Sequence, residues 1–127
     1  MKRTVLLITV VVMLTGVGRA AHSRKSHRNP EAYYQKEWCA EHGGRAEVVL
    51  ADATRCDCLT ETNAIEFDFA PKWAEAIGQA LYYGAMTGKE PGIVLIVSGP
   101  SDAKYIERIK AVADRYGIVI AVWTMDE

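Results

Sequence analysis

The sequence has no internal repeat, no low-complexity segment and no Cys-x-x-Cys pair. The absence of such a pair at a helix start argues against thiol-redox chemistry. Half of the 127 residues are apolar. A chain of this length and composition is long enough for one domain with an ordinary core and too short for two.

Long apolar runs are scarce, and the main one lies at the N-terminus. Lys2 and Arg3 precede an apolar stretch over residues 5–17, and Gly18-Arg19-Ala20 places small residues where a signal peptidase reads them. We therefore expect a signal peptide over residues 1–20, export to the periplasm or the exterior, and no stable membrane association after cleavage. An uncleaved anchor is the less favoured alternative, because the run is shorter than the ~20 residues that span a membrane.

Positive charge is also not in excess, since 15 basic residues face 16 acidic ones. Removal of the signal peptide takes three cations and no acid, so the net charge of the mature chain becomes about −4. Contact with a polyanion then needs a local basic surface. The basic arm over residues 21–29 is one candidate, and a solvated, flexible terminus is its equally weighted alternative.

Cysteine is rare, and its three copies, Cys39, Cys56 and Cys58, all belong to the mature chain. An oxidising compartment permits one bridge. Cys39 could reach either of the other two, and we favour a disulfide between Cys39 and Cys58. A lesser alternative is a zinc site that combines Cys39-x-x-His42 with Cys56-x-Cys58.

Turn and capping signals divide the mature chain into alternating elements. We expect helices over residues 30–42, 71–87 and 100–116, and strands over 45–50, 54–59, 63–69, 93–97 and 118–123. The first three strands form an antiparallel meander, and the apolar strand over 93–97 is fully buried. The prediction is an α/β fold in which helices sandwich a mixed sheet, with the order αβββαβαβ in a single domain over residues 30–127.

The hairpin of the second and third strands opposes two carboxylates. A two-residue loop at Glu61-Thr62 sets Cys58 opposite Ile65 and Asp57 opposite Glu66. Directly opposed like charges are unfavourable on a strand pair, and a divalent cation such as Mg²⁺ or Ca²⁺ offsets them. The hairpin therefore predicts a metal site, with two hydrated surface carboxylates as the alternative.

Two further features surround this pair. The same register places Arg55 opposite Asp68, where the two side chains are expected to form an ion pair. On the following helix, a polar stripe lies beside the apolar face and is expected to line a site, unless it is only a solvated edge. Its members are Lys72, Glu75, Gln79 and Tyr83.

Asp57, the tripeptide Glu66-Phe67-Asp68 and the Gln79-x-x-x-Tyr83 spacing together resemble the PD-(D/E)XK nuclease superfamily, in its RecB-like Gln-x-x-x-Tyr variant. The expected element order is similar to the core of that family. The resemblance covers most of the mature chain. It departs at Asp68, where the family usually has lysine, and aspartate cannot supply positive charge to a phosphate.

The resemblance implies a role for each matching residue. Asp57 and Glu66 are expected to bind Mg²⁺ or Mn²⁺, with Asp68 and the helix residue Glu37 as further metal ligands. Lys72 is expected to supply the missing positive charge, and Gln79 and Tyr83 to position the phosphate.

The function implied by the resemblance is an exported, metal-dependent nuclease that hydrolyses phosphodiester bonds in DNA or RNA. DNA is the first expectation, and whether the chain forms a homodimer stays open. The alternative is a catalytically degenerate, nuclease-like binding module, which the aspartate at position 68 and the acidic mature charge both favour.

Overall fold

The computed structural model describes residues 26–127. The predicted signal peptide over residues 1–20, and residues 21–25 of the basic arm, lie outside the described residues. The remaining chain folds into helices and strands in the following order: α1 (Glu31–Glu41), β1 (Arg45–Val49), β2 (Arg55–Leu59), β3 (Asn63–Phe69), α2 (Trp73–Thr87), β4 (Glu90–Val97), α3 (Ala103–Tyr116) and β5 (Ala121–Asp126).

The strands form one mixed sheet in the order β1-β2-β3-β4-β5. The pairs β1–β2 and β2–β3 are antiparallel, whereas β3–β4 and β4–β5 are parallel. Short connections explain the antiparallel pairs, since a tight turn can only reverse the chain, and crossover helices explain the parallel ones. The prediction of an α/β fold with a mixed sheet and helices on it is confirmed.

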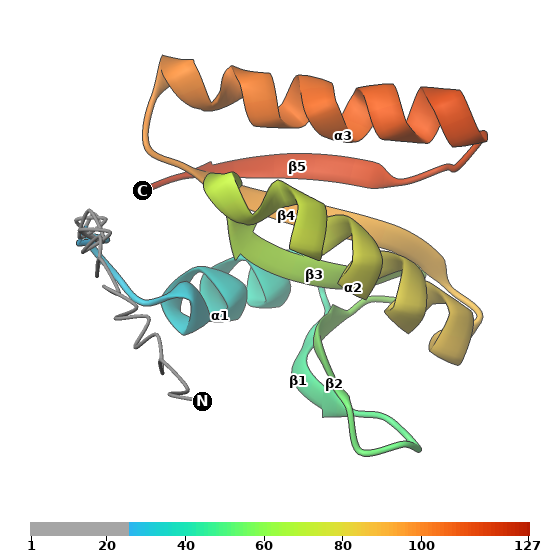
Figure 1. Ribbon diagram of the computed structural model, residues 1–127. Helices are drawn as coiled ribbons and strands as arrows, with labels where there is room; N and C mark the ends of the chain where they lie inside the picture. Colours follow the sequence, from blue (N-terminus) through green and yellow to red (C-terminus); the bar gives the residue numbers. More distant parts are fainter. Residues whose placement is uncertain (1–25) are drawn as a thin grey trace, which may run out of the picture.

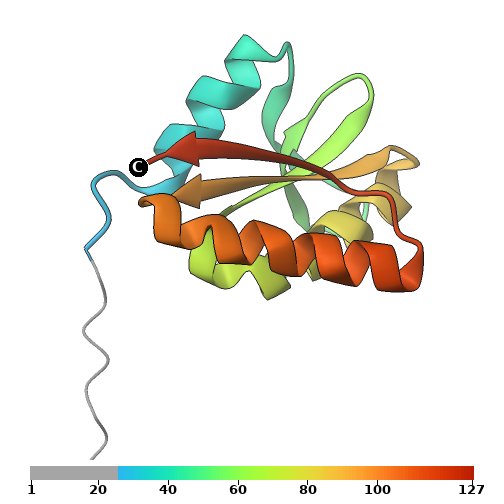
Figure 2. The same ribbon diagram turned by 90° about the horizontal axis from the view of Figure 1, so that it is seen from above.

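Helices cover both faces of this sheet. Figures 1 and 2 show α2 and α3 on one face and α1 on the other, while the β1–β2 hairpin projects away from the main body. On the α1 face, Trp38 packs against Phe67 of β3 and Val94 of β4. The two parallel connections therefore place the α2 and α3 layer opposite α1.

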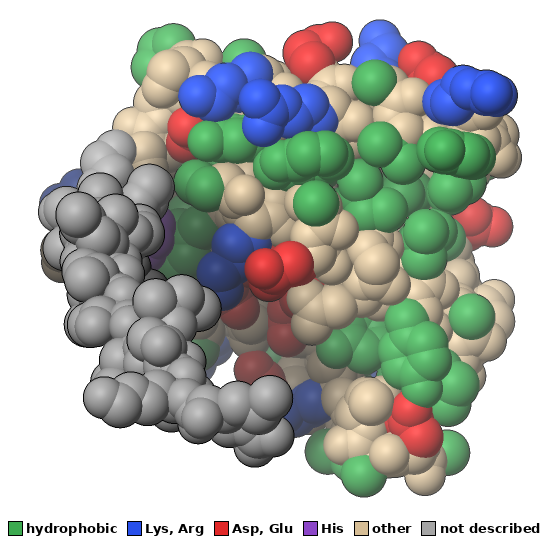
Figure 3. Space-filling view, viewed as in Figure 1, with side chains coloured by type: hydrophobic (Ala, Val, Ile, Leu, Met, Phe, Trp, Pro, Cys, Tyr) green, Lys and Arg blue, Asp and Glu red, His purple; other side chains and the backbone are tan. Residues whose placement is uncertain are grey.

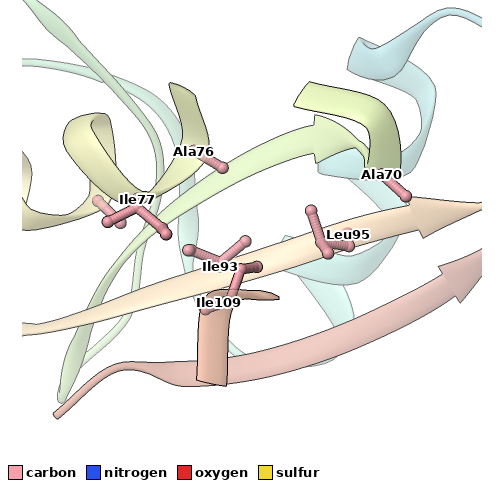
Figure 4. Close-up of a cluster of buried hydrophobic side chains, with 7 residues drawn as sticks. Ala70, Ala76, Ile77, Ile93, Leu95 and Ile109 are labelled. Carbon is pink, nitrogen blue, oxygen red and sulfur yellow. The ribbon is translucent and has the colours of Figure 1, made fainter. Parts of the chain in front are cut away.

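The larger core lies between the sheet and the two later helices. Ile93 and Leu95 of β4 are fully buried there and pack with Ile77 of α2 and Ile109 of α3. Figure 4 shows these side chains converging from the strand and the helices. A strand that is buried on both faces explains why the sequence of β4 is almost continuously apolar.

Several boundaries differ from the sequence prediction. Strand β4 starts at Glu90 rather than at residue 93, α3 starts at Ala103 after a short 3₁₀ turn, Pro100–Asp102, and β5 ends at Asp126 rather than at residue 123. Pro71 lies in a short 3₁₀ turn, Ala70–Lys72, and the α-helix itself starts at Trp73. The last strand starts at Ala121 rather than at residue 118, because the chain leaves α3 through a left-handed Gly117 and the Ile118 N–H still bonds to the Ala113 carbonyl. The chain therefore begins to pair with β4 only at Ala121, after this helix cap.

The predicted disulfide between Cys39 and Cys58 is present and joins α1 to β2. It agrees with a chain that folds in an oxidising compartment. Cys56 is a buried free thiol whose Sγ donates to the backbone carbonyl of Cys58. The zinc alternative is wrong, because the bridge uses two of its four ligands and the His42 ring stacks on Trp38.

Among residues 26–127, no helix has both the length and the apolar composition needed to cross a membrane.

Candidate functional site

The site forms where β2 and β3 separate. Cys58 pairs with Ile65, as the turn predicted, and Leu59 pairs with Ala64, but the pairing stops there. Beyond that point the Phe67 N–H donates to the Asp57 carboxylate, Oδ2, at 2.8 Å. A side chain thus replaces the strand partner that the backbone has lost, and it holds the Asp57 carboxylate in the gap between the strands.

Two further carboxyl groups point from β3 to the same face of the sheet. Glu66 and Asp68 alternate with core residues along the strand, and their exposed fractions are only 5% and 4%. Acidic side chains are seldom buried this completely unless they are paired with a charge or a ligand. Their burial needs an explanation that the strand alone does not supply.

Glu66 lies at the centre of the group. Its Oε2 is buried and has no hydrogen-bond partner among residues 26–127. Burial, followed by the negative charge of Asp57 and a hydrogen bond with it, raises the pKa of Glu66 to about 10. Burial also raises the pKa of Asp57, and the Phe67 N–H partly opposes this change. Without a cation, the pair therefore holds a proton at neutral pH.

Asp68 is the third member, and it has a cation beside it. Burial, followed by the charge of Glu31, raises the pKa of Asp68 to about 7. The Lys72 ammonium opposes this shift, and its Nζ lies 3.8 Å from Asp68 Oδ1. Lys72 remains more than half exposed, at 57%. The predicted cation therefore stands at the solvent side of the acidic group.

The acidic residue that α1 contributes to the group is Glu31, not Glu37. Burial and the charge of Asp57 raise the pKa of Glu31, and its Oε1 accepts a hydrogen bond from Gln35 Nε2 at 3.1 Å. Gln35 is only 4% exposed, and its Oε1 has no partner within the described part of the chain. Glu37 is exposed and interacts with Tyr33.

Glu31 and Gln35 were missed from the sequence, although a signal existed. Glu31, Gln35 and Trp38 share one face of α1, because residues four and seven apart lie on the same side of a helix. Trp38 faces the sheet. Choosing the face that carries the large buried aromatic residue selects Glu31 and excludes Glu37.

The Gln79-x-x-x-Tyr83 pair forms another wall of the site. Tyr83 is 7% exposed and packs against Cys56 and Ala64, the latter one position along the same β3 face from Glu66. Burial, with the charges of Glu66 and Asp57 next, raises the pKa of Tyr83 to about 12. Gln79 is exposed and hydrogen-bonds to Tyr83. The structure therefore brings Tyr83 to the carboxyl group, and Gln79 lies beside Tyr83 at the exposed side.

Arg55 does not pair with Asp68, and its charge only partly opposes the rise that burial causes in the pKa of Asp57. Its Nε lies 3.1 Å from Glu47 Oε2 on β1, so the expected ion pair with Asp68 is wrong. The reason is that the two strands separate. At the Arg55 end, β2 pairs with β1 and no longer pairs with β3. The Arg55 guanidinium therefore lies beside β1 rather than beside β3. Lys72 is the cation next to Asp68.

The surface is hollowed near the start of α2, the helix that follows β3 and Lys72. Figure 3 shows this hollow below the start of α2, with acidic atoms in its depth and Lys or Arg atoms at its rim. Within residues 26–127, no three His, Cys, Asp or Glu side chains are already arranged around a point where a metal ion could sit. The described site is a partly protonated group of carboxyls that is open to solvent on one side.

Comparison with protein-family models, with curated proteins and with solved structures finds no match to this chain.

Proposed function

We propose that this domain is a metal-dependent phosphodiester hydrolase that acts on nucleic acid. The observation that carries the proposal is the buried Glu66 carboxyl, with one oxygen lacking a partner, placed between Asp57 and Asp68 at the point where two strands separate. Isolated buried carboxyls are unfavourable. A divalent cation that binds at this point removes the repulsion.

The element order supports the same proposal. Helix α1, the antiparallel strands β1 to β3, helix α2 and the parallel strand β4 follow the order that the PD-(D/E)XK resemblance implies. Asp57 and Glu66 come from the second and third strands, and Gln79 and Tyr83 from the next helix. We infer a restriction-endonuclease-like core from this combination of order and side chains.

The donor set fits magnesium or manganese. Mg²⁺ prefers oxygen ligands and usually keeps several waters, so one or two carboxylates are sufficient protein ligands. Asp57 and Glu66 would hold the ion, with Asp68 or Glu31 next to them. When bound, the cation supplies Lewis-acid polarisation of the phosphoryl group and lowers the pKa of water.

The other residues have separate tasks. The Phe67 N–H fixes Asp57 in one orientation, so the carboxylate needs no reorganisation when the cation arrives. The exposed Lys72 ammonium stabilises negative charge on the phosphate, the task that the family lysine performs at position 68. Tyr83 limits where the phosphate can lie, because its side chain borders the carboxyl group, and Gln79 holds Tyr83 in place.

The test is cleavage of supercoiled plasmid and of single-stranded RNA by the purified mature chain, with Mg²⁺, with Mn²⁺ and with a chelator. We expect cleavage only with a cation, and a loss of at least about a hundredfold in Glu66→Gln. Glu37→Gln is the matched control, since it removes an exposed acid from α1 and should keep full activity. Equal activity in the wild type and Glu66→Gln, or no cleavage of either substrate by the wild type, would contradict the proposal.

A second candidate is a binding module without catalysis. Two observations favour it: Asp68 stands where the family has lysine, and Lys72 is partly neutralised by that aspartate at 3.8 Å. Such a module binds its partner through the same hollow and needs no divalent cation. In that case Asp57 and Glu66 always share a proton, and this proton, rather than a metal ion, removes their repulsion.

A further inference from the structure

A stripe of positive charge runs along α3. Lys104, Arg108 and Arg115 fall within about 40° of one another around the helix axis, and the remaining member of the stripe is Ala111. All four side chains are exposed. The two acidic residues of α3, Glu107 and Asp114, lie to one side of the stripe. The stripe therefore presents cations to solvent without interruption by an acid.

Aromatic contacts connect this stripe to the hollow. The Arg108 guanidinium lies 5.7 Å from the ring centroid of Trp73 and 5.3 Å from that of Tyr105. Lys104 Nζ lies 4.9 Å from the Tyr105 centroid. Trp73 directly follows Lys72, whose ammonium lies beside Asp68. Cations and aromatic rings thus form a continuous path from the carboxyls to α3.

We propose that this path, Lys72, Trp73, Arg108, Tyr105 and Lys104, binds the sugar–phosphate backbone of a nucleic-acid strand and guides it into the hollow. The inference rests on the proposed function and deepens it, because it names the surface that holds the substrate. Figure 3 shows Lys and Arg atoms along α3, above the hollow. Alternating cations and aromatic rings suit a strand that offers both phosphates and bases.

The charge of the chain makes such a surface necessary. The mature chain is acidic overall, and the hollow itself holds carboxyls, so a polyanion is repelled from most directions. A row of cations on one side of the hollow gives the strand a single favourable approach. The repeat along the helix also suits a strand, since Lys104 and Arg108 are separated by about 6 Å along the axis.

Binding is measured separately from cleavage, by fluorescence anisotropy of short labelled oligonucleotides in chelator, in a Glu66→Gln background that cannot cut them. The variant is Lys104→Ala with Arg108→Ala. We expect its affinity to fall at least about tenfold. The slope of log affinity against log salt should decrease by about 1.4 for a single strand, or about 1.8 for a duplex, because two phosphate contacts are lost.

The matched control is Lys36→Ala with Lys110→Ala, which removes the same charge from exposed positions on α1 and on another side of α3. This control should retain affinity within about twofold. A second variant, Lys104→Arg, keeps both positive charges and leaves Arg108 over its aromatic rings, so it should retain binding. Far-UV circular dichroism and melting curves show whether each variant is folded.

Several outcomes overturn the inference: no oligonucleotide binding by the Glu66→Gln protein, an equal loss in the control variant, or an unchanged salt slope in the alanine variant. A different result would contradict the hydrolase alone. In it, the wild type cuts no substrate, but the alanine variant still loses affinity for the oligonucleotide, which supports the binding path. Where the wild type does cut, the alanine substitutions in the catalytic protein should raise KM at least about fivefold and leave kcat within about twofold.

Discussion

Strands β3 and β4 lie side by side, yet they place opposite chemistry on the same face of the sheet. In the parallel register Glu66 lies beside Ile93, and Asp68 lies beside Leu95. All four side chains are almost completely buried. The aliphatic pair packs with α2 and α3, whereas the acidic pair lies beside the Asp57 carboxylate and the Lys72 ammonium.

The difference shows how one sheet serves two purposes. Burial of the β4 side chains removes apolar surface from water and stabilises the fold. Burial of the β3 carboxyls destabilises the folded protein when these groups are ionised. For this reason the pKa values of Glu66 and Asp68 are raised. Burial of the aliphatic side chains of β4 therefore compensates for the stability that burial of the β3 carboxyls costs.

The largest expected effect comes from weakening the aliphatic strand. Leu95→Ala should lower the free energy of unfolding by about 2–5 kcal/mol, because it removes buried methyl groups and leaves a cavity. Urea denaturation followed by circular dichroism measures the change. Val119→Ala, at a site that is 76% exposed, is the control and should change stability by less than about 0.5 kcal/mol. A loss below about 1 kcal/mol for Leu95→Ala contradicts this view of the core.

The acidic strand should make stability depend on pH. The pKa values of Glu66 and Asp68 are raised from 4.5 to about 10 and from 3.8 to about 7, so the folded state binds more protons than the unfolded state between these values. The free energy of unfolding is therefore highest below the unfolded pKa values. In chelator it should fall as the pH rises from about 5 to 8, by on the order of 1 kcal/mol for each pH unit.

Glu66→Gln tests the origin of this slope. The amide has nearly the same shape and no charge, so the variant should be more stable than the wild type at pH 8 by about 2 kcal/mol and should show a smaller pH dependence. Glu37→Gln, on the exposed side of α1, should follow the wild-type curve. Parallel curves for the wild type and Glu66→Gln would mean that Glu66 is ionised in the folded protein.

Binding of a cation should produce the smallest of these changes in the free energy of unfolding. It should also offset the loss of stability that a rise in pH causes. At a Mn²⁺ concentration about tenfold above its dissociation constant, the wild type should gain about 1.4 kcal/mol, seen as a rise of several degrees in the melting temperature. The gain should increase with pH, because Mn²⁺ competes with protons for the carboxyls. Glu66→Gln should gain little. No response of the wild type at any pH favours the binding module over the hydrolase.

Most of the architecture was predictable because its signals are local. The Glu61-Thr62 turn and the alternation of side chains placed Cys58 opposite Ile65, as observed. Gly88 and Gly117 end α2 and α3 in the left-handed conformation, as helix-stop signals suggest. The continuous apolar run of β4 predicted a strand buried on both faces.

The errors in the site have one cause in common. Local patterns do not specify how a helix is rotated about its axis or where two paired strands part. Glu37 was expected because it matches the place of an additional acidic ligand in the family that the chain resembles, but the rotation of α1 brings Glu31 to the carboxyls instead. Arg55 was assigned to Asp68 because the ladder was extended past the point where β2 turns away and pairs only with β1. The path on α3 was not expected either, because Trp73 and Arg108 are far apart in sequence.

The sequence by itself determined the element order, the hairpin register, the export signal as a prediction, and the choice of Asp57 and Glu66 as the central pair. These properties depend on turns, on side-chain alternation and on composition, which act over a few residues. Only the tertiary structure decided that Glu31 and Gln35 join the carboxyls, that Lys72 is the nearby cation and that α3 lies next to Trp73. Those contacts depend on how whole elements pack, and packing minimises the exposed apolar area of the entire domain rather than of any one segment.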